Sequence, residues 1–202
     1  LRVYAHVEPP DFYRTADELG LLVWQDFPLN WGYSDAPAFV DDAQRQLAAM
    51  ITQLFNHPSI VLWCMHNDSP WQSPQAGQRM SDYDRRQNKR LDEVLSAQAT
   101  ELDPTRFVLI NSGGSDKHIY AGWDTGAWTD YAEVPGAPFI SEYGAQALPN
   151  FGAMVRMLPP DHLTYRDGET RTRWEFHDFL ARPTFDVLGG KLWLHLGAVL
   201  EF

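Results

Sequence analysis

The chain has 202 residues, of which 16 are Lys or Arg and 27 are Asp or Glu, so its formal net charge is −11. A chain this acidic repels phosphate backbones and anionic lipid headgroups, and we expect it to bind neither nucleic acid nor a membrane. Hydrophobic residues make up 44% of the chain and aromatic residues 13%, which is enough apolar material for a large core and excludes a disordered protein. The sequence has no apolar run near the roughly 18 residues of a membrane span and does not open with a signal peptide, so we expect a soluble protein and assign no compartment.

Short apolar runs alternate with helical patterns along the chain. Strands are predicted at 1–7, 20–27, 59–65, 106–111 and 138–144, with a sixth near the HIYAGW segment within 116–131. Helices are predicted at 9–19, 41–56 and 84–102. Strands that are separated by helices pair in parallel, so the pattern predicts an α/β fold. The loops at 69–82, 112–137 and 159–173 are long and rich in Gly, Pro and Ser, which is typical of functional loops.

Polar residues follow the predicted strands at the point where each strand ends. They are His6 and Glu8, Gln25 and Asp26, His66, Asn67 and Asp68, Asn111 and Ser112, and Glu142. In a (β/α)8 TIM barrel the carboxyl ends of the strands converge on one face, where the active site lies. At any single strand such residues could simply begin a solvated loop, but five strands that share the pattern favour a site.

Two carboxylates stand out among these residues. Asp68 follows the apolar run SIVLWCM and Glu142 ends the run PFIS, so both are expected at the mouth of a core, where burial can tune a carboxyl pKa. A pair of carboxylates on either side of a glycosidic bond can perform acid/base and nucleophilic chemistry. Loop aromatics could stack on the C–H face of a sugar or simply pack: Trp31, Trp71, Trp123, Trp128 and Tyr131. These residues alone predict a barrel with a carboxylate-lined pocket, and an enzyme.

A hydrolytic metal site is the main alternative from residue chemistry. His6, His66, Asp26 and Asp68 could converge at the mouth of a barrel as zinc ligands. The sequence lacks the H-x-H and H-E-x-x-H spacings of such sites, so we predict no metal and no other cofactor. The single cysteine, Cys64, excludes a disulfide framework and is predicted to be a buried apolar residue of its strand.

Three segments, in chain order, carry a resemblance to a known family. ADELGLLVWQDFPL (16–29) resembles the third-strand segment of glycoside hydrolase family 2, which includes β-galactosidases, β-glucuronidases and β-mannosidases. HPSIVLWCMHND (57–68) resembles the fourth-strand motif of the retaining glycoside hydrolases of the same large barrel clan, and FISEYGAQALP (139–149) is similar to the seventh-strand motif that carries their nucleophile. The motif Val-Trp-Gln-Asp-Phe (23–27) is most similar to that of the β-mannosidase branch of the family. The resemblance covers residues 1 to about 180 and implies a TIM barrel and a retaining β-glycosidase acting on β-mannosides or β-galactosides.

The resemblance also implies a role for each matching residue. Glu142 matches the nucleophile, and Asp68 occupies the acid/base position. Asn67 matches the asparagine that hydrogen-bonds the sugar 2-hydroxyl, and His6 matches a sugar contact at the end of the second strand. Three further matches are pocket-lining positions or neighbours of the nucleophile: Asp26, Trp123 and Tyr143.

The acid/base position departs from the family, which has Glu where this chain has Asp68. The carboxyl group of Asp is retracted by about one C–C bond, roughly 1.5 Å. We expect retaining catalysis first, with backbone adjustment restoring the reach of the carboxylate. The alternatives are an impaired site that still binds carbohydrate and, third, an inverting enzyme.

The barrel predicted from this chain is partial. Residues 1–7 correspond to strand two and residues 138–144 to strand seven, and a (β/α)8 barrel typically needs about 250 residues. We treat 1–202 as a single partial TIM-barrel domain in which 191–202, KLWLHLGAVLEF, is an atypical tail. Because open strand edges invite pairing, we expect a fragment of a longer enzyme, self-association, or further domains that cover the edges.

Overall fold

The computed structural model of the chain describes residues 1–72, 84, 86–121, 128–133, 139–143, 151–157 and 159–160. The chain divides into two compact units. One consists of Leu1–Tyr120 and Glu133–Gly144, and the other of Ala121–Ala132 and Ala145–Phe202. The first unit contains every strand described below, and the second contains helix α5 (Phe151–Met157). The predicted tail at 191–202 lies outside the described residues, so the single-domain prediction stays a prediction.

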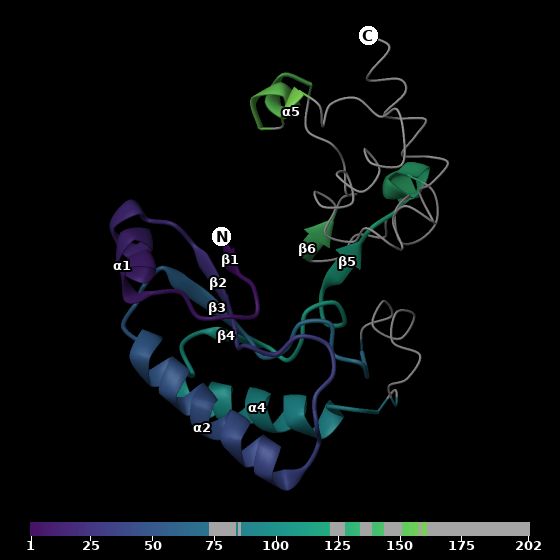
Figure 1. Ribbon diagram of the computed structural model, residues 1–202. Helices are drawn as coiled ribbons and strands as arrows, with labels where there is room; N and C mark the ends of the chain where they lie inside the picture. Colours follow the sequence, from purple (N-terminus) through teal and green to yellow (C-terminus); the bar gives the residue numbers. More distant parts are fainter. Residues whose placement is uncertain are drawn as a thin grey trace. The chain divides into compact units, whose positions relative to one another are not determined.

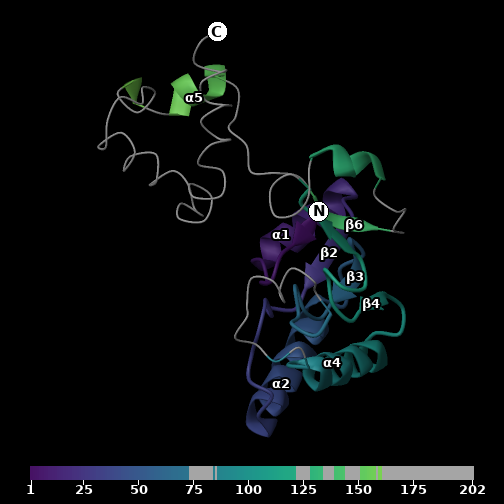
Figure 2. The same ribbon diagram turned by 90° about the vertical axis from the view of Figure 1, so that its right-hand side faces the viewer.

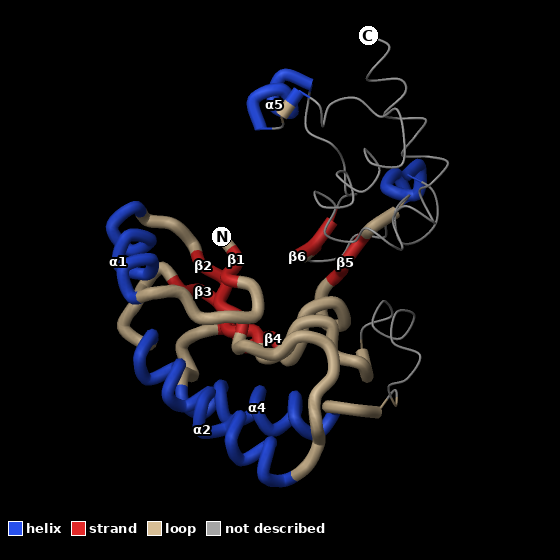
Figure 3. Tube along the Cα trace, in the orientation of Figure 1, coloured by secondary structure: helices blue, strands red, loops and turns tan. Residues whose placement is uncertain are grey.

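A parallel sheet of four strands organises the first unit (Figures 1 and 3). Its strands are β1 (Arg2–Val3), β2 (Val23–Asp26), β3 (Ile60–Cys64) and β4 (Phe107–Leu109), and strands that are consecutive in the chain pair with each other. The connections carry helices α1 (Pro10–Leu19), α2 (Pro37–Leu54) and α4 (Lys89–Leu102). Strands β5 (Lys117–Ile119) and β6 (Ile140–Tyr143) form a second parallel pair. Parallel strands added in chain order without reversal are how a TIM barrel winds, so the predicted partial barrel of the α/β class is confirmed.

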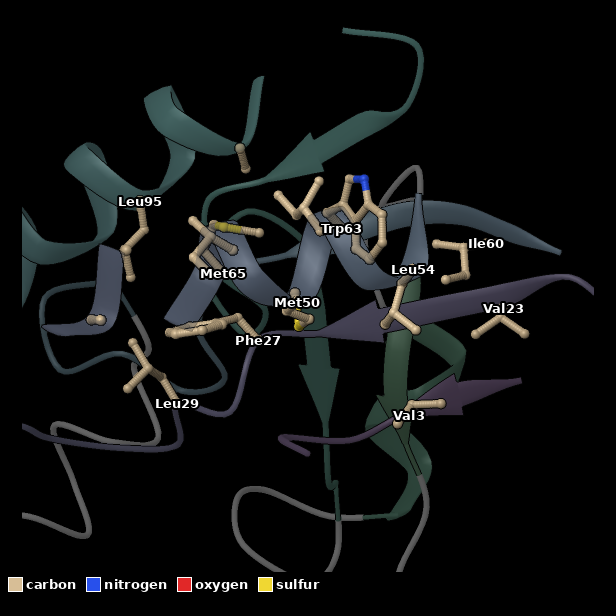
Figure 4. Packing of buried hydrophobic residues seen from close by; sticks show 14 of the residues in the cluster. Val3, Val23, Phe27, Leu29, Met50, Leu54, Ile60, Trp63, Met65 and Leu95 are labelled. Carbon is tan, nitrogen blue, oxygen red and sulfur yellow. The ribbon is translucent and has the colours of Figure 1, made fainter. Parts of the chain in front are cut away.

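The main hydrophobic core lies between the four-stranded sheet and its helices. Helices α2 and α4 lie side by side against the sheet (Figure 2), and the apolar face of α2 contributes Leu47, Ile51 and Leu54. Figure 4 shows Leu54 beside Ile60 and Trp63 of β3. Trp63 is fully buried, and its indole N–H donates to the carboxylate of Asp103 (2.8 Å) just after α4, which ties the strand to the helix end.

The other face of the sheet is also apolar. Trp24, Cys64 and Leu109 form a small buried cluster there, and exposed apolar side chains surround it. A cavity of about 450 Å³ extends over this face, and its lining includes Leu22, which is 66% exposed, and Phe107, which is 63% exposed. In a closed barrel this face is the packed interior, which explains why these strands are apolar on both sides.

Proline and glycine set the two ends of helix α1 as predicted. Helix α1 begins with Pro10 at its first position and ends at Gly20, whose φ of +66° allows its N–H to cap the carbonyls of Ala16 and Asp17. The sixth strand predicted near HIYAGW is confirmed as β5.

Among the residues that the structure describes, no helix combines the length and apolar character needed to cross a membrane.

Candidate active site

Polar side chains from five strands meet at one edge of the first unit. Asp26 ends β2, Asp68 lies four residues beyond β3, and Ser112 follows β4. His118 and Glu142 lie directly opposite each other in β5 and β6. Because parallel strands share one direction, their carboxyl ends bring these residues together, as the pattern of polar strand ends predicts.

Glu142 is held by two partners on its two oxygens. The Arg2 guanidinium donates to Oε1 from Nη1 (2.8 Å), and the Tyr120 hydroxyl donates to Oε2. Burial, together with the hydrogen bond to Glu142, raises the pKa of Tyr120, so its hydroxyl keeps its proton and stays a donor. Both partners are donors, so the two bonds fix the orientation of the carboxylate.

Arg2 pairs with Glu142 and also with the buried carboxylate of Asp26. Its Nη2 lies 2.9 Å from Oδ2 of Asp26 and donates to Oδ1 of Asn67 at 2.7 Å. Asp26 is fully buried and also accepts the Trp24 indole N–H (2.6 Å). Burial raises the pKa of Asp26 despite the opposing effect of Arg2. The guanidinium therefore has two tasks, since it neutralises Asp26 in the core and orients Glu142 at the surface of the site.

Asp68 occupies a strained position after β3. Its φ of +49° lies in the left-handed region that few non-glycine residues adopt. The carboxylate accepts from Nδ2 of Asn67 at Oδ2 (3.2 Å) and contacts Nδ1 of His118 at Oδ1 (3.0 Å). Gly113 makes room for this contact, because a Cβ at that position would lie 2.6 Å from Oδ1 of Asp68.

The buried His118 lies between the two catalytic candidates. Its Nε2 is 2.9 Å from Oγ of Ser112 and 3.5 Å from Oε1 of Glu142. One oxygen of Asp68, one oxygen of Glu142 and one ring nitrogen of His118 all lie within 4.8 Å of one another. Such a trio could ligate a cation, but Arg2 already supplies positive charge to Glu142, so we assign no metal to it.

Replacing Gly113 with Ala is expected to displace Asp68. The substitution adds a Cβ against Asp68 and imposes a φ of +93° on a residue with a side chain, which costs about 1–3 kcal/mol of unfolding free energy. A displacement of about 1 Å can reduce kcat/KM by about 100-fold. Denaturant unfolding and steady-state kinetics measure the two effects.

Gly20 gives the matched control for this substitution. It also has a positive φ, +66°, but nothing lies within 4 Å of a Cβ built there. Gly20→Ala is therefore expected to lower stability modestly and leave kcat/KM unchanged. Equal losses of activity in the two variants would contradict a specific role of Gly113 at Asp68.

A cavity of about 410 Å³ opens beside Glu142. Its lining consists of Arg2, Tyr4, Tyr120, Ser141, Glu142 and Tyr143. Burial, together with the nearby charges of Glu142 and Asp68, raises the pKa of Tyr4 to about 12, so this hydroxyl also remains a donor at neutral pH. A cavity rimmed by phenol hydroxyls, a guanidinium and a carboxylate offers both donors and acceptors to a polyol ligand.

The other residues predicted for the site have mixed positions. Asn67 lies within the cluster, and its Nδ2 contacts the Tyr4 hydroxyl (3.0 Å) as well as Asp68. Tyr143 lines the cavity and is 74% exposed. His6 points elsewhere, since Nε2 bonds to Glu8 (2.8 Å) and Nδ1 to the Tyr4 carbonyl (2.7 Å). Asp26 supports the site from the core through Arg2 and does not line the cavity, and Trp123 lies outside the described residues.

The four residues considered as zinc ligands do not converge. Ring nitrogens of His66 contact the buried carboxylate of Asp92 (2.7 Å) and the Trp31 carbonyl (2.6 Å), while His6 pairs with Glu8. The same Asp92 accepts the indole N–H of Trp71 (2.7 Å). The histidine–aspartate pair therefore orients the loops that carry Trp31 and Trp71.

Arg2, Tyr120 and His118 contact the two candidate carboxylates, and the sequence analysis did not identify them. The signal for Arg2 was present, because a charged residue inside the apolar run LRVYAHV needs a buried partner. The signal for His118 and Tyr120 was weaker, since both lie in a short segment with little periodicity.

The chain is similar in sequence to proteins of one enzyme family. The model of the glycosyl hydrolases family 2 TIM barrel domain matches residues 8–181. A β-mannosidase from Rattus norvegicus is 25% identical over 184 residues, which are 78% of this chain and 21% of that protein. A putative β-glucuronidase from Formosa agariphila is 29% identical over 142 residues, which are 66% of this chain and 17% of that protein. The chain thus spans about a fifth of the length of these relatives.

The solved structures that match this chain include the same two kinds of enzyme as the sequence relatives, a β-mannosidase and a β-glucuronidase. The β-D-mannosidase of Dictyoglomus thermophilum superposes with a TM-score of 0.61 at 28% identity, covering 86% of this chain and 23% of that one. Bacteroides uniformis β-glucuronidase 2, in covalent complex with cyclophellitol-6-carboxylate aziridine, gives a TM-score of 0.57 at 25% identity, covering 72% of this chain and 20% of that one. With a family model spanning most of its length and a sheet wound as a barrel, the chain belongs to glycosyl hydrolase family 2, of whose TIM barrel domain it forms a part.

Proposed function

We propose that the protein is a retaining β-glycosidase in which Glu142 is the nucleophile and Asp68 the acid/base. The observation that carries the proposal is the approach of the two carboxylates, one oxygen of each lying within 4.8 Å of the other. Retaining enzymes hold the two carboxyl groups about 5–5.5 Å apart, whereas inverting enzymes need about 6.5–9.5 Å to fit a water molecule. The short approach favours retention even with Asp in the place of Glu.

The surroundings of the two carboxylates suit these roles. Glu142 would attack the anomeric carbon while the glycosidic C–O bond breaks and Asp68 protonates the leaving oxygen. A water molecule would then cleave the glycosyl ester, returning a proton to Asp68 and releasing Glu142. Arg2 and Tyr120 donate to the two oxygens of Glu142 and orient the carboxylate for the attack. The φ of +49° at Asp68 and the missing side chain at Gly113 support a carboxylate that reaches the site from a shorter residue.

The substrate class proposed first is a terminal β-mannoside. β-Mannosidases recur among the sequence relatives, and one solved structure that matches is a β-D-mannosidase. β-Glucuronidases are the second group, with one sequence relative and several solved structures. β-Galactosides remain a third candidate, from the family resemblance.

Covalent trapping tests the proposal. We expect one 2-deoxy-2-fluoro-β-glycosyl fluoride, from a panel with manno, glucurono and galacto configuration, to add one glycosyl group to the peptide that contains Glu142. Intact-mass and peptide mass spectrometry of the full-length protein measure the adduct. Glu8→Gln is the control and is expected to gain the same adduct on Glu142, because Glu8 pairs with His6 and not with Glu142. The sugar that labels fastest identifies the substrate class.

A carbohydrate-binding protein without turnover is the second candidate, and the shortened residue at Asp68 is the observation that favours it. Sugar binding by calorimetry without any adduct on Glu142 would support that reading and overturn the first.

A further inference from the structure

The side chain of Asn67, which the family resemblance matches to a contact with the sugar 2-hydroxyl, is fully buried and fully hydrogen-bonded. Its Nδ2 carries two hydrogens and lies close to three acceptors: the Tyr4 hydroxyl (3.0 Å), Oδ1 of Asn30 (3.0 Å) and Oδ2 of Asp68 (3.2 Å). Its Oδ1 accepts from Nη2 of Arg2 (2.7 Å). The amide of Asn67 therefore has no hydrogen left to donate to a ligand.

Tyr4, which follows β1, connects this amide to the cavity beside Glu142. Tyr4 is 42% exposed and lines the cavity of about 410 Å³, whereas Asn67 is not among the described residues that line it. Cζ of Arg2 lies over the Tyr4 ring, 5.2 Å from its centre, and Nη1 of the same guanidinium donates to Glu142. A ligand in the cavity therefore meets the hydroxyl of Tyr4 in place of the amide of Asn67.

The hydrogen bonds of the Tyr4 hydroxyl leave one acceptor position open. Its proton is directed to Oδ1 of Asn30 (3.1 Å), because a carbonyl oxygen only accepts. Burial, together with nearby negative charge, raises the pKa of Tyr4 to about 12, so the hydroxyl keeps this proton at neutral pH. One of its two lone pairs accepts from Nδ2 of Asn67 (3.0 Å). The second lone pair is left to accept from the O–H group of a ligand.

The position of the Tyr4 hydroxyl indicates which sugar hydroxyl it meets. The Tyr4 hydroxyl and Oδ2 of Asp68 lie 3.0 and 3.2 Å from the same atom, Nδ2 of Asn67. In the proposed reaction Asp68 protonates the glycosidic oxygen and Glu142 attacks the anomeric carbon. The 2-hydroxyl is on the carbon next to the anomeric carbon, so it is the ring hydroxyl closest to the glycosidic oxygen and to Tyr4.

We propose that the hydroxyl of Tyr4 accepts the hydrogen bond of the sugar 2-hydroxyl, with Asn30 and Asn67 as the positioning residues that fix its direction. The inference rests on the proposed glycosidase function and deepens it. As positive charge develops at the anomeric carbon, the 2-hydroxyl becomes a stronger donor, so this bond strengthens in the transition state. β-Mannosides, β-glucuronides and β-galactosides all carry a 2-hydroxyl, so the contact applies to each candidate substrate class.

Tyr4→Phe in the full-length protein tests the contact through the 2-position of the substrate. We expect kcat/KM for aryl glycosides with a 2-hydroxyl to fall by about 10- to 100-fold, because the lost bond is strongest in the transition state. The matching 2-deoxy glycosides lack the donor, so their kcat/KM should change by less than about threefold. The ratio of the two values is the readout, since a substitution that only disturbed the fold would lower both alike.

Tyr33→Phe is the matched control for this ratio. The Tyr33 hydroxyl also contacts Asn30, by accepting its backbone N–H (3.2 Å), but Tyr33 does not line the cavity. The control is expected to leave the ratio unchanged. A ratio that stays constant in Tyr4→Phe, or that changes equally in the two variants, overturns the proposal.

Fluoroglycoside trapping separates this inference from the proposed function. The 2-deoxy-2-fluoro reagents have no 2-hydroxyl, so Tyr4→Phe should label Glu142 at a rate within about threefold of the unsubstituted protein. No labelling of the unsubstituted protein refutes the glycosidase itself. Normal labelling together with an unchanged substrate ratio refutes the Tyr4 contact alone.

A crystal structure covers the case in which Tyr4→Phe does not fold. The full-length Glu142→Gln variant, soaked with an aryl glycoside that carries a 2-hydroxyl, is expected to show Oη of Tyr4 within about 3.0 Å of the sugar 2-oxygen. A 2-oxygen bound to Nδ2 of Asn67, with Tyr4 displaced, would overturn the proposal.

Discussion

Replacing Glu142 with Gln is expected to reduce kcat/KM by about 10⁴-fold or more. An amide keeps the hydrogen-bonding shape of the side chain but cannot form the glycosyl ester, and losing a nucleophile removes most of the rate enhancement of an enzyme. Hydrolysis of an activated aryl glycoside by the full-length protein measures the loss. The fold should persist in this variant, because Glu142 is a half-buried group whose partners Arg2 and Tyr120 can still bond to an amide.

Chemical rescue completes this test. Glu142→Gly leaves space for a small anion, and azide is expected to restore turnover and give a glycosyl azide of inverted anomeric configuration. Glu8→Gln, the control used for trapping, should retain full activity. A Glu142→Gln variant that keeps more than about a tenth of the activity would rule out Glu142 as the nucleophile.

Replacing Arg2 with Met should give the largest loss of stability. The fully buried carboxylate of Asp26 then loses its cationic partner, and breaking a buried ion pair on one side costs about 3–5 kcal/mol. Denaturant unfolding measures the free energy. Arg14→Met is the matched control, because Arg14 forms an exposed pair with Asp11 (3.0 Å) whose contribution is about 0–1 kcal/mol. Equal effects of the two substitutions would show that the Arg2 pair does not support the core.

The pH dependence of this loss has a definite sign. Burial raises the pKa of Asp26 in the folded protein, and Arg2 limits the rise. Removing Arg2 raises that pKa further, so the folded variant binds a proton more readily than the unfolded chain does. The stability contribution of Asp26 is then greatest below its ordinary pKa of about 3.9 and is lost as pH rises through the folded pKa. The penalty of Arg2→Met is therefore expected to be largest near neutral pH and to shrink toward pH 4.

Much of the fold could be predicted because apolar runs and chain breakers are local signals. The strand at 59–65 is confirmed as β3, Ile60–Cys64, and the helix at 9–19 is confirmed as α1. Helix boundaries were less accurate. Helix α2 begins at Pro37 instead of residue 41, since Pro fits the first turn, and α4 begins at Lys89 instead of residue 84. The late start of α4 follows from Asn88, which adopts a φ of +66° and whose side chain accepts the Tyr33 N–H (2.8 Å).

The candidate site was only partly predictable, for a physical reason. Asp68 follows one conspicuous apolar run and Glu142 ends another, so position alone identified them as candidates. The partners of these carboxylates cannot be identified in the same way, because Arg2 and His118 gain their meaning from contacts across distant segments. His6 shows that position near a strand end can also mislead. Its side chain turns away from the candidate site and bonds to its neighbour Glu8.

The order in which the site is assembled follows from the two pairs that Arg2 makes. Asp26 is 24 residues away along the chain, whereas Glu142 is 140 residues away. A ribosome that adds about 5–20 residues per second needs roughly 6–23 s to make the 142 − 26 = 116 residues between the two carboxylates. During that interval Asp26 can already neutralise and orient the guanidinium on the nascent sheet. Glu142 then arrives at a binding partner that is already folded, so the ion pair that stabilises the core also serves as a template for β6.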